Sequence, residues 1–395
     1  FWLKLPFVDQ AIRNYHSWVY AILCYACGGQ VLYAMIDFDD LEDAEKVNGI
    51  DFEAAIAKQD RPVEIEELEI EDVPKKAYIA FVDFWPGFDD NTDKWVSKRW
   101  FEENLLDVEI VHELNDPEVV VFSLFGNKNI QIERRRRAKL VHYIGENVRP
   151  PLREVPLCIS FDHTPDVPLS VHMRLPIWVL NREVHEVMKL HAARLNGQFD
   201  AKVRHRPGFC SWVASNATDY NASVRLKFVE DLSRRYKEVS CGGSVMNNVG
   251  GPVKDKLAFL RGYKFNVCFE NGSHPGYCTE KLLHAFAGGS VPIYWGDPRV
   301  ARAALVDGGP EPDFNPAALI SAHDFSSFEE LIEHISRVDK DPRLFEEYLK
   351  QPILSESWYN KLRNWPEFRR DLSQRILENA AQYRCEDDYV EDFCF

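Results

Sequence analysis

The chain has 395 residues, a formal net charge of −16, 45% apolar residues and 13% aromatic residues. Its length suggests two domains rather than one, and its apolar content is enough for sizeable cores, which excludes a largely disordered protein. The acidic balance argues against a nucleic-acid partner, because proteins that bind nucleic acids need a basic surface.

The first notable segment, residues 18–36, has no formally charged side chain over 19 residues. Its length is compatible with the span of a type II membrane protein. Two glycines, a glutamine and two cysteines near its centre favour instead a pair of buried helices in a soluble protein. Cys24 and Cys27 have a ligand-like spacing but no second pair, so we expect neither zinc nor redox chemistry there.

An acidic segment follows, up to Pro74. Between Asp37 and Asp72 it holds 15 acidic and 3 basic residues, which leaves the rest of the chain near −4. The segment is also low in aromatic residues, and this pattern predicts a helical or flexible linker. We therefore treat residues 1–75 as an N-terminal extension.

Four short apolar runs predict the strands of a first α/β domain. Helical stretches alternate with them, which is typical of a parallel sheet. The runs are residues 77–84, 119–124, 140–144 and 157–161. Strand signals stop between Leu180 and Pro207, so we place this domain at residues 76–190 and a second domain at residues 191–355.

The second domain begins with a predicted strand at 209–214 and a helix at 221–239. Residues 263–297 then form a complete strand–loop–helix–strand unit, whose helix is capped by Thr279 and ended by two glycines. In such a unit, polar groups between strand and helix lie at the crevice where α/β sheets bind ligands. That set suits the ribose hydroxyls and phosphates of a nucleotide and comprises Glu270, Asn271, Tyr277, Glu280 and Lys281.

The same unit closely resembles the signature of the α1,3/α1,4-fucosyltransferases, glycosyltransferase family ten. Among these enzymes it is most similar to the bacterial type. The family pattern is Phe-Glu-Asn, a loop, Tyr-x-Thr-Glu-Lys, a helix, Val-Pro-Ile/Val and a glycine. Here it stands as Phe269-Glu270-Asn271, Tyr277-Cys278-Thr279-Glu280-Lys281, Val291-Pro292-Ile293 and Gly296. The resemblance runs from about residue 78 to about residue 355.

This resemblance implies a GT-B fold, in which two Rossmann-like α/β domains face each other across a cleft and the second binds the donor nucleotide. It implies an inverting enzyme that moves L-fucose from GDP-fucose to a GlcNAc hydroxyl, O3 or O4, of a LacNAc- or lacto-type oligosaccharide. It also implies that the last helices, within residues 356–395, pack back on the first domain. Residues 358–383 have the pattern of such helices.

The candidate general base is Glu146. It follows a buried strand and a glycine, so it should project from the carboxyl end of the strand into the cleft, and it matches the base of the family. An ordinary loop carboxylate is the plain alternative. Asp83, near the end of the first strand, is the rival base, whereas we expect His142 to face the core.

The candidate cations for the diphosphate are Arg225 and Lys281. Arg225 follows Ser215-Asn216 at a spacing that resembles a donor-binding element of the family, and its guanidinium fork suits phosphate oxygens. Lys281 lies in the first turn of the helix, where the helix N-terminus adds partial positive charge. The alternative is that both are surface cations.

The resemblance assigns Glu280 to the ribose hydroxyls. We expect Asn271 and Tyr277 to contact the base, ribose or phosphates, so the donor set is Ser215, Asn216, Arg225, Asn271, Tyr277, Glu280 and Lys281.

No metal or cofactor is expected. The pair Asp37-x-Asp39 has the spacing of a manganese-binding pair but lies in the acidic linker, so we interpret it as solvated charge. No Gly-x-Gly-x-x-Gly follows a strand and no P-loop sequence occurs, which argues against dehydrogenases and P-loop NTPases. The remaining alternatives are a GT-B transferase for another nucleotide sugar and an inactive glycan- or nucleotide-binding module.

Nine cysteines, several of them in strand-like apolar runs, favour a reducing compartment. We therefore expect a cytoplasmic location. Contact with the inner membrane surface is an alternative for the basic face of residues 358–383. Whether Cys385 and Cys394 pair is open.

Overall fold

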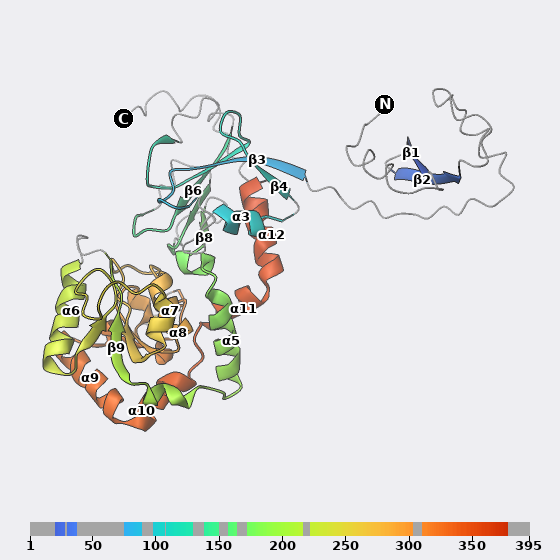
Figure 1. The fold of residues 1–395 in the computed structure, drawn as a ribbon. Coiled ribbons are helices and arrows are strands. Elements are labelled where there is room, and N and C mark those ends of the chain that lie inside the picture. Colours follow the sequence, from blue (N-terminus) through green and yellow to red (C-terminus); the bar gives the residue numbers. More distant parts are fainter. Residues whose placement is uncertain are drawn as a thin grey trace. The chain divides into compact units, whose positions relative to one another are not determined.

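The computed structural model describes residues 20–27, 30–37, 75–88, 98–106, 108–128, 138–149, 157–163, 172–215, 222–302 and 310–377. The chain divides into two compact units, residues 1–73 and residues 74–395 (Figure 1). The predicted linker at 38–74 and the two C-terminal cysteines lie outside the described residues.

The first unit contains an antiparallel β-hairpin, so the prediction of a helix pair or a membrane-spanning helix at residues 18–36 is wrong. Strand β1 (Tyr20–Cys27) pairs with β2 (Gln30–Asp37), and Cys27 lies opposite Gln30. In the sequence only Gly28-Gly29 separates the two strands, and a Gly-Gly pair between two apolar runs is a sequence signal for a hairpin. Together with the β-branched and aromatic residues on either side, this pair is a hairpin signal that we underweighted.

The second unit begins with a six-stranded, all-parallel sheet in the order β4-β3-β5-β6-β7-β8. Runs of β-branched and aromatic residues form its central strands, and Val119 to Phe122 are buried throughout. All four predicted strands are present. The bounds are β3 Lys75–Val82, β4 Val108–His112, β5 Val119–Phe122, β6 Lys139–Ile144, β7 Leu157–Ser160 and β8 His172–Arg174.

A second parallel sheet follows in the order β10-β9-β11-β12-β13. It contains the predicted strands near residues 209, 264 and 291, and two short strands that we did not predict. The bounds are β9 Gly208–Trp212, β10 Val239–Cys241, β11 Tyr263–Val267, β12 Val291–Tyr294 and β13 Ile320–Ser321.

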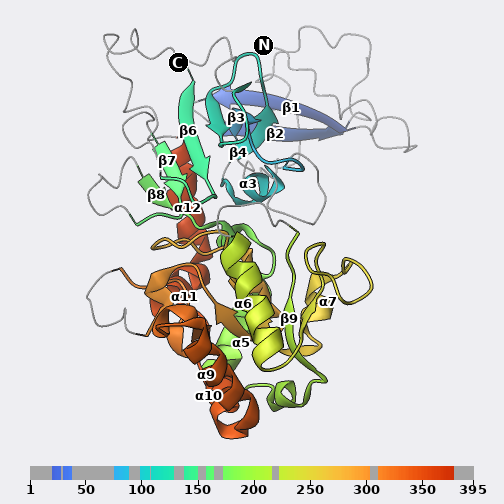
Figure 2. The same cartoon turned by 90° about the vertical axis from the view of Figure 1, so that its left-hand side faces the viewer.

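The described helices connect and cover these sheets (Figures 1 and 2). The predicted domain boundary at residue 190 falls inside α5, which lies between the last strand of one sheet and the first of the other. The α-helices are α3 Lys98–Asn104, α5 Val184–Leu195, α6 Ala222–Arg235, α7 Lys256–Leu260, α8 Glu280–Ala287, α9 Phe328–Lys340, α10 Pro342–Lys350, α11 Glu356–Arg363 and α12 Trp365–Leu377. Short 3₁₀ turns include η3 Ile177–Leu180, η4 Ala201–His205, η5 Pro298–Val300, η7 Pro316–Ala318 and η8 Ala322–Asp324.

The largest core cluster runs through both halves of this unit. It joins Ile79 and Tyr143 of the first sheet to Leu282 and Phe286 of α8 and to Trp358 of α11. A second cluster packs β9 and β11 under α6, α9 and α10. Helix α8 is thus buried against the first half of the unit, which brings its N-terminal turn close to the first sheet.

The last helices return to the first sheet. In α12, the hydroxyl of Ser373 accepts a hydrogen bond from the backbone N–H of Leu106 at 2.7 Å. The indole of Trp365 donates to the side-chain oxygen of Asn104, at the end of α3, at 3.0 Å. Figure 1 shows α12 beside α3. No helix among the described residues has the length and apolar character that crossing a bilayer requires.

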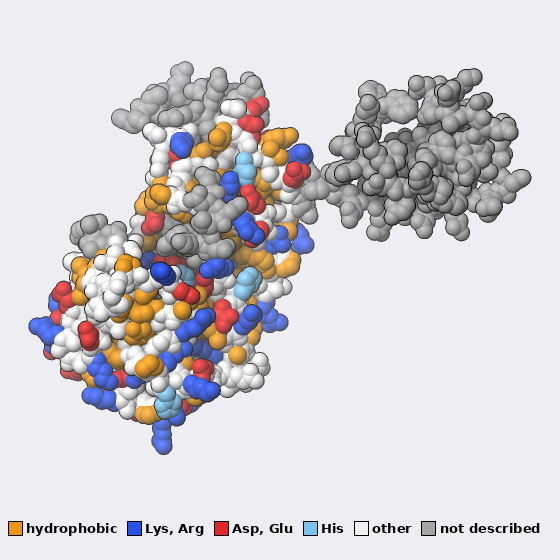
Figure 3. Space-filling model, viewed as in Figure 1, with side chains coloured by type: hydrophobic (Ala, Val, Ile, Leu, Met, Phe, Trp, Pro, Cys, Tyr) orange, Lys and Arg blue, Asp and Glu red, His pale blue; other side chains and the backbone are white. Residues whose placement is uncertain are grey.

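On the face drawn in Figure 3, lysine and arginine side chains are interspersed with acidic ones over the described residues. This mixed surface matches the small net charge that the sequence leaves outside residues 37–72.

A buried carboxylate also connects the two halves. Asp313, fully buried, forms an ion pair at 2.8 Å with Arg174, which ends β8. It accepts indole hydrogen bonds from Trp178 of η3 at 2.8 Å and from Trp358 of α11 at 2.7 Å. One carboxylate therefore ties together three separate stretches of the chain.

We expect Asp313→Asn to lower the free energy of unfolding by about 2 kcal/mol, because the amide removes the charge that Arg174 pairs with and presents an N–H group to other donors. Urea denaturation of the variant would measure this. Asp371→Asn is the control, since Asp371 pairs with Arg375 on an exposed helix face and should change stability by less than about 0.5 kcal/mol. Equal stabilities for the two variants would contradict the role of Asp313.

Candidate active site

The loop between β11 and α8 is held at both ends by Glu270. This side chain is fully buried, and its carboxylate accepts hydrogen bonds from the backbone N–H of Thr279 at 2.7 Å and from its hydroxyl at 2.6 Å. Thr279 in turn caps α8, as the sequence predicts, by accepting from the backbone N–H of Lys281. Glu270 therefore holds the loop.

Lys281 lies among acidic side chains at the start of α8. Its Nζ is 3.3 Å from Glu270 Oε2, 3.3 Å from Glu280 Oε1 and 3.1 Å from Thr279 Oγ1. Burial would lower the pKa of Lys281, but Glu280 and Glu270 raise it, so the side chain stays charged. The predicted phosphate cation is thus fixed in place by two carboxylates.

Glu280 is held ionised. Burial would raise its pKa, but the positive charges of Lys281 and Lys256 lower it to about 2. Lys256, at the start of α7, donates to His284 Nδ1 at 2.9 Å, and the other ring nitrogen of His284 lies 3.6 Å from Glu183. An ionised carboxylate is a strong acceptor for a pair of ribose hydroxyls.

Lys256 is a residue of this site that sequence reasoning missed. It belongs to the stretch Gly250-Gly-Pro-Val-Lys-Asp-Lys256, to which we assigned no role from the sequence. Its electrostatic partners include Glu280, Lys281 and Glu270, all on the next strand–helix unit. Only the folding of α7 against α8 brings them together.

Glu146 follows β6 and contacts the loop between β11 and α8. The hydroxyl of Tyr277 donates to Glu146 Oε2 at 3.4 Å, which links the first sheet to the second half of the unit. Burial raises the pKa of Glu146 above its ordinary 4.5, an effect that Lys281 opposes and Glu280 reinforces. A carboxylate whose pKa is moved toward neutrality is better suited to accept a proton than a solvated one.

The rival acids and bases of the first sheet have other roles. Asp83 is buried in a left-handed backbone conformation, with φ of 59°, and accepts from the backbone N–H of Lys128 at 2.8 Å. A Cβ atom at Gly126 would lie 2.5 Å from its carboxylate, so the loop after β5 is built closely around Asp83. His142 is buried and stacks on Phe122, and burial lowers its pKa to about 4, in agreement with the predicted core position.

Arg225 and Asn271 form a second part of the predicted donor set. Arg225 of α6 is 3% exposed and donates from Nη1 to the side-chain oxygen of Asn271 at 3.0 Å. Ser215 is exposed, and its carbonyl accepts from Ser244 at 3.2 Å. Asn216 lies outside the described residues. The structure thus pairs Arg225 with Asn271 and groups Glu146, Tyr277, Glu280 and Lys281, but no described contact places Ser215 with either group.

Arg149 is a further cation that we did not predict, and it lies beside the loop between β11 and α8. Three residues after Glu146, it donates to Asp162 at 2.8 Å and to Asn147 at 2.7 Å, and it lies 2.7 Å from the ring of His274 on that loop. Because Asp162 and His274 are distant in sequence, no local pattern could have shown this bridge.

Within the part of the chain that the structure describes, no group of three His, Cys, Asp or Glu side chains has the arrangement of a metal site. What the geometry does offer is a half-buried, fixed cation at Lys281, an ionised carboxylate at Glu280 and a carboxyl of raised pKa at Glu146, on neighbouring elements. This combination suits the transfer of a group from a phosphate leaving group to a hydroxyl.

Two family models match the chain. The model described as Glycosyltransferase family 10 (fucosyltransferase) C-term matches residues 203–364, and the Alpha-(1,3)-fucosyltransferase FucT N-terminal domain matches residues 79–181. Together they cover about two thirds of the chain and both parallel sheets. The chain belongs to glycosyltransferase family 10.

This family-10 chain is 31% identical over 283 residues to the alpha-(1,3)-fucosyltransferase FucT of Helicobacter pylori, an alignment that covers 63% of the chain and 55% of that protein. It is 30% identical over 211 residues to human GDP-fucose protein O-fucosyltransferase 3, with 51% of the chain and 41% of that protein covered. The chain thus spans about half the length of the curated relatives it matches.

The fold is also similar to a crystal structure of an alpha1,3-fucosyltransferase with GDP-fucose. The TM-score is 0.55 at 25% identity, and the match covers 77% of this chain and 93% of the other. This similarity and the two parallel sheets confirm the predicted α/β fold of GT-B type.

Proposed function

We propose that this family-10 chain is an inverting fucosyltransferase that moves L-fucose from GDP-fucose to a GlcNAc hydroxyl, O3 or alternatively O4, of a LacNAc-type glycan. The observation that carries the proposal is the contact of Glu146 with Tyr277, because it sets the candidate base of the first sheet beside the loop and helix that hold Lys281. The similar proteins support the donor, since one is a GDP-fucose protein O-fucosyltransferase and another is an alpha1,3-fucosyltransferase whose crystal structure contains GDP-fucose.

In the proposed reaction, Glu146 removes the proton from the acceptor hydroxyl while the fucosyl–phosphate bond breaks. The transition state has oxocarbenium character at the sugar, and negative charge develops on the departing diphosphate. Lys281 and Arg225 stabilise that charge, and Glu280 binds the ribose hydroxyls. Attack from the face opposite the leaving group turns the β-linked donor into an α-linked product.

We propose no essential metal, because fixed cations and the N-terminus of α8 supply the positive charge that the diphosphate needs. The assay is GDP release from GDP-fucose with N-acetyllactosamine as acceptor, with and without EDTA. Acceptor-dependent release that EDTA leaves unchanged is the expected result, and loss of activity on chelation would contradict it.

The donor and the acceptor can be tested separately. Thermal shifts with GDP, UDP and CMP report the nucleotide, since a specific ligand stabilises the folded state in proportion to its occupancy. The names of the relatives indicate different acceptors, since one enzyme modifies a glycan and another is a protein O-fucosyltransferase. The assay should therefore include a folded protein acceptor beside the glycan. Stabilisation by GDP without release on either acceptor would favour an inactive binding module.

We expect Lys256→Met to raise KM for GDP-fucose about five- to tenfold with little change in kcat. Glu280 stays ionised because Lys281 remains, but the loss of one of the two lysine charges beside it should leave the carboxylate less firmly positioned for the ribose hydroxyls. Lys254→Met is the control, because Lys254 is exposed and two residues away. If both variants raise KM equally, or if kcat falls with KM unchanged, Lys256 does not act through Glu280.

We also propose a reducing, cytoplasmic location. Five cysteines of the two parallel sheets and the loop between β11 and α8, Cys158, Cys210, Cys241, Cys268 and Cys278, are unpaired and buried, as expected of structural thiols. Mass spectrometry after alkylation of the native-source protein tests this, and a disulfide within the chain would contradict it.

A further inference from the structure

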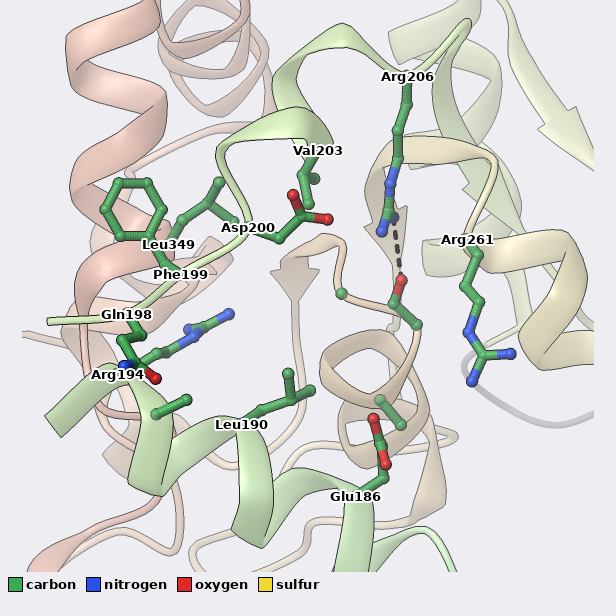
Figure 4. A pocket seen from close by; sticks show the side chains of 14 residues that line it. Glu186, Leu190, Arg194, Gln198, Phe199, Asp200, Val203, Arg206, Arg261 and Leu349 are labelled. Carbon is green, nitrogen blue, oxygen red and sulfur yellow. Dashed lines mark hydrogen bonds between the residues drawn. The ribbon is translucent and has the colours of Figure 1, made fainter. Parts of the chain in front are cut away.

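A second candidate site shares no residue with the predicted donor set and does not include Glu146. It is a cavity of about 480 Å³ lined by α5, η4, the turn after α7, the end of α8 and α10 (Figure 4). Three arginines border it: Arg194 from α5, Arg206 after η4 and Arg261 after α7. Figure 4 shows their side chains around the pocket, with Glu186 and Asp200 as the acidic residues of the lining.

Two of these guanidinium groups are anchored on one side only. Arg194, which is 8% exposed, donates from Nη1 to the carbonyl of Gln351 at 3.1 Å. Arg206 donates from Nη1 to the carbonyls of Tyr263 and Gly288, each at 2.9 Å. In both groups the described hydrogen bonds involve Nη1 alone, which leaves Nε and Nη2 of each fork for another acceptor.

Charge in the cavity is not balanced by ion pairs. None of the three arginines forms an ion pair with another described residue, although Asp200 and Glu186 are nearby. Burial lowers the pKa of Arg194 to about 10 and also lowers the pKa of Arg206, but both remain cationic at neutral pH. Asp200 partly offsets the effect of burial on Arg206, whereas burial alone acts on Arg194, and a buried cation of this kind gains most from an incoming anion.

Gly289 leaves space for the guanidinium group of Arg206. Gly289 has a φ of 71°, and a Cβ atom there would lie 2.9 Å from Arg206 Nη2. Apolar side chains, among them Leu190, Phe199 and Leu349, complete the wall. The volume exceeds that of a bare phosphate ion and lies in the range of small-molecule sites.

We infer that this cavity binds an oxyanion, a phosphate or carboxylate group carried by a small molecule, between the forks of Arg194 and Arg206, with Arg261 at the rim. Arginine forks match the paired oxygens of either group. The site lies at the C-terminal end of α8, whereas Glu280 and Lys281 lie at its N-terminal end, so binding here does not require the donor site.

The test is calorimetric titration of the full chain with inorganic phosphate and with citrate, at constant ionic strength. We expect saturable binding of at least one probe, and the two arms decide between phosphate and carboxylate. Arg261→Gln should weaken it about fivefold, since Arg261 is exposed and no described hydrogen bond anchors its side chain. Glu186→Gln should strengthen it about threefold by removing a like charge.

Two controls keep the result interpretable. Arg370→Gln, an exposed arginine of α12 outside the cavity, should bind as the wild type does. Lys281→Met should also keep the binding, which separates this cavity from the donor site. The inference is overturned if neither probe saturates, if Arg261→Gln and Glu186→Gln titrate like the wild type, or if Lys281→Met abolishes binding.

Discussion

Lys281→Met should lower kcat/KM for fucosyl transfer by about 30- to 1000-fold, which corresponds to about 2–4 kcal/mol of transition-state stabilisation. The reason is positional. Two carboxylates, each 3.3 Å from Nζ, hold the ammonium at the N-terminus of α8, so it meets the departing diphosphate without first being ordered. Steady-state kinetics with GDP-fucose and N-acetyllactosamine measure the loss.

The matched controls are Lys281→Arg and Lys227→Met. Arginine keeps the charge between Glu270 and Glu280 and should recover part of the activity. Lys227 pairs with Asp231 on an exposed face of α6, so its loss should leave kcat/KM within about twofold of wild type. Thermal melts are needed beside the kinetics, because the methionine variant leaves the buried Glu270 and the half-buried Glu280 with one cation fewer. If folded Lys281→Met turns over like the wild type, Lys281 is not the cation that stabilises the departing diphosphate.

The strands that sequence could predict are those buried on both faces. Residues 119–122 read Val-Val-Val-Phe and are buried throughout, so local composition and tertiary environment agree. Of the strands that we did not predict, β8, β10 and β13 have only two or three residues, too short for any periodicity to show, and β4 is partly exposed. Helix α5 was missed because its dense His, Arg and Lys residues obscured the apolar positions Val184 and Val187 that it buries.

The hairpin of β1 and β2 shows a different failure. An uncharged 19-residue run satisfies the length criterion for a membrane span, and its many alanines are compatible with helix. The decisive feature of the sequence is the Gly-Gly pair near its centre, which helices disfavour and tight hairpins favour. We gave the overall hydropathy of the run more weight than the local turn signal of its two glycines.

The site was predictable where its residues lie within one strand–loop–helix unit. Asn271, Tyr277, Glu280 and Lys281 are close in sequence, and the topology of a parallel sheet places such a loop at the ligand-binding edge. The charged residues that lie beside this unit come from elsewhere: Lys256 from α7 and Arg149 from the loop after β6. These contacts depend on how the helices pack, and this packing cannot be predicted from a single stretch of sequence.

Glu146→Gln should lower acceptor-dependent transfer by about 10²- to 10⁴-fold, the range of general base catalysis. The amide can still accept the hydrogen bond from Tyr277 but cannot take up a proton. Binding of GDP, measured by calorimetry, should stay within about threefold of wild type. Glu109→Gln, an exposed glutamate of β4 in the same sheet, serves as the control and should transfer normally.

The pH dependence gives a sharper test of the same residue. Burial raises the pKa of Glu146 above 4.5, and the base works only when ionised, so activity should rise with pH through that raised value. The hydrogen bond from Tyr277 opposes the shift, because it stabilises the ionised carboxylate. Tyr277→Phe should therefore move the acidic limb of the kcat/KM profile to higher pH, whereas Glu146→Gln should remove the limb. A limb that stays in place in Tyr277→Phe, or that persists in Glu146→Gln, would mean that another group accepts the proton.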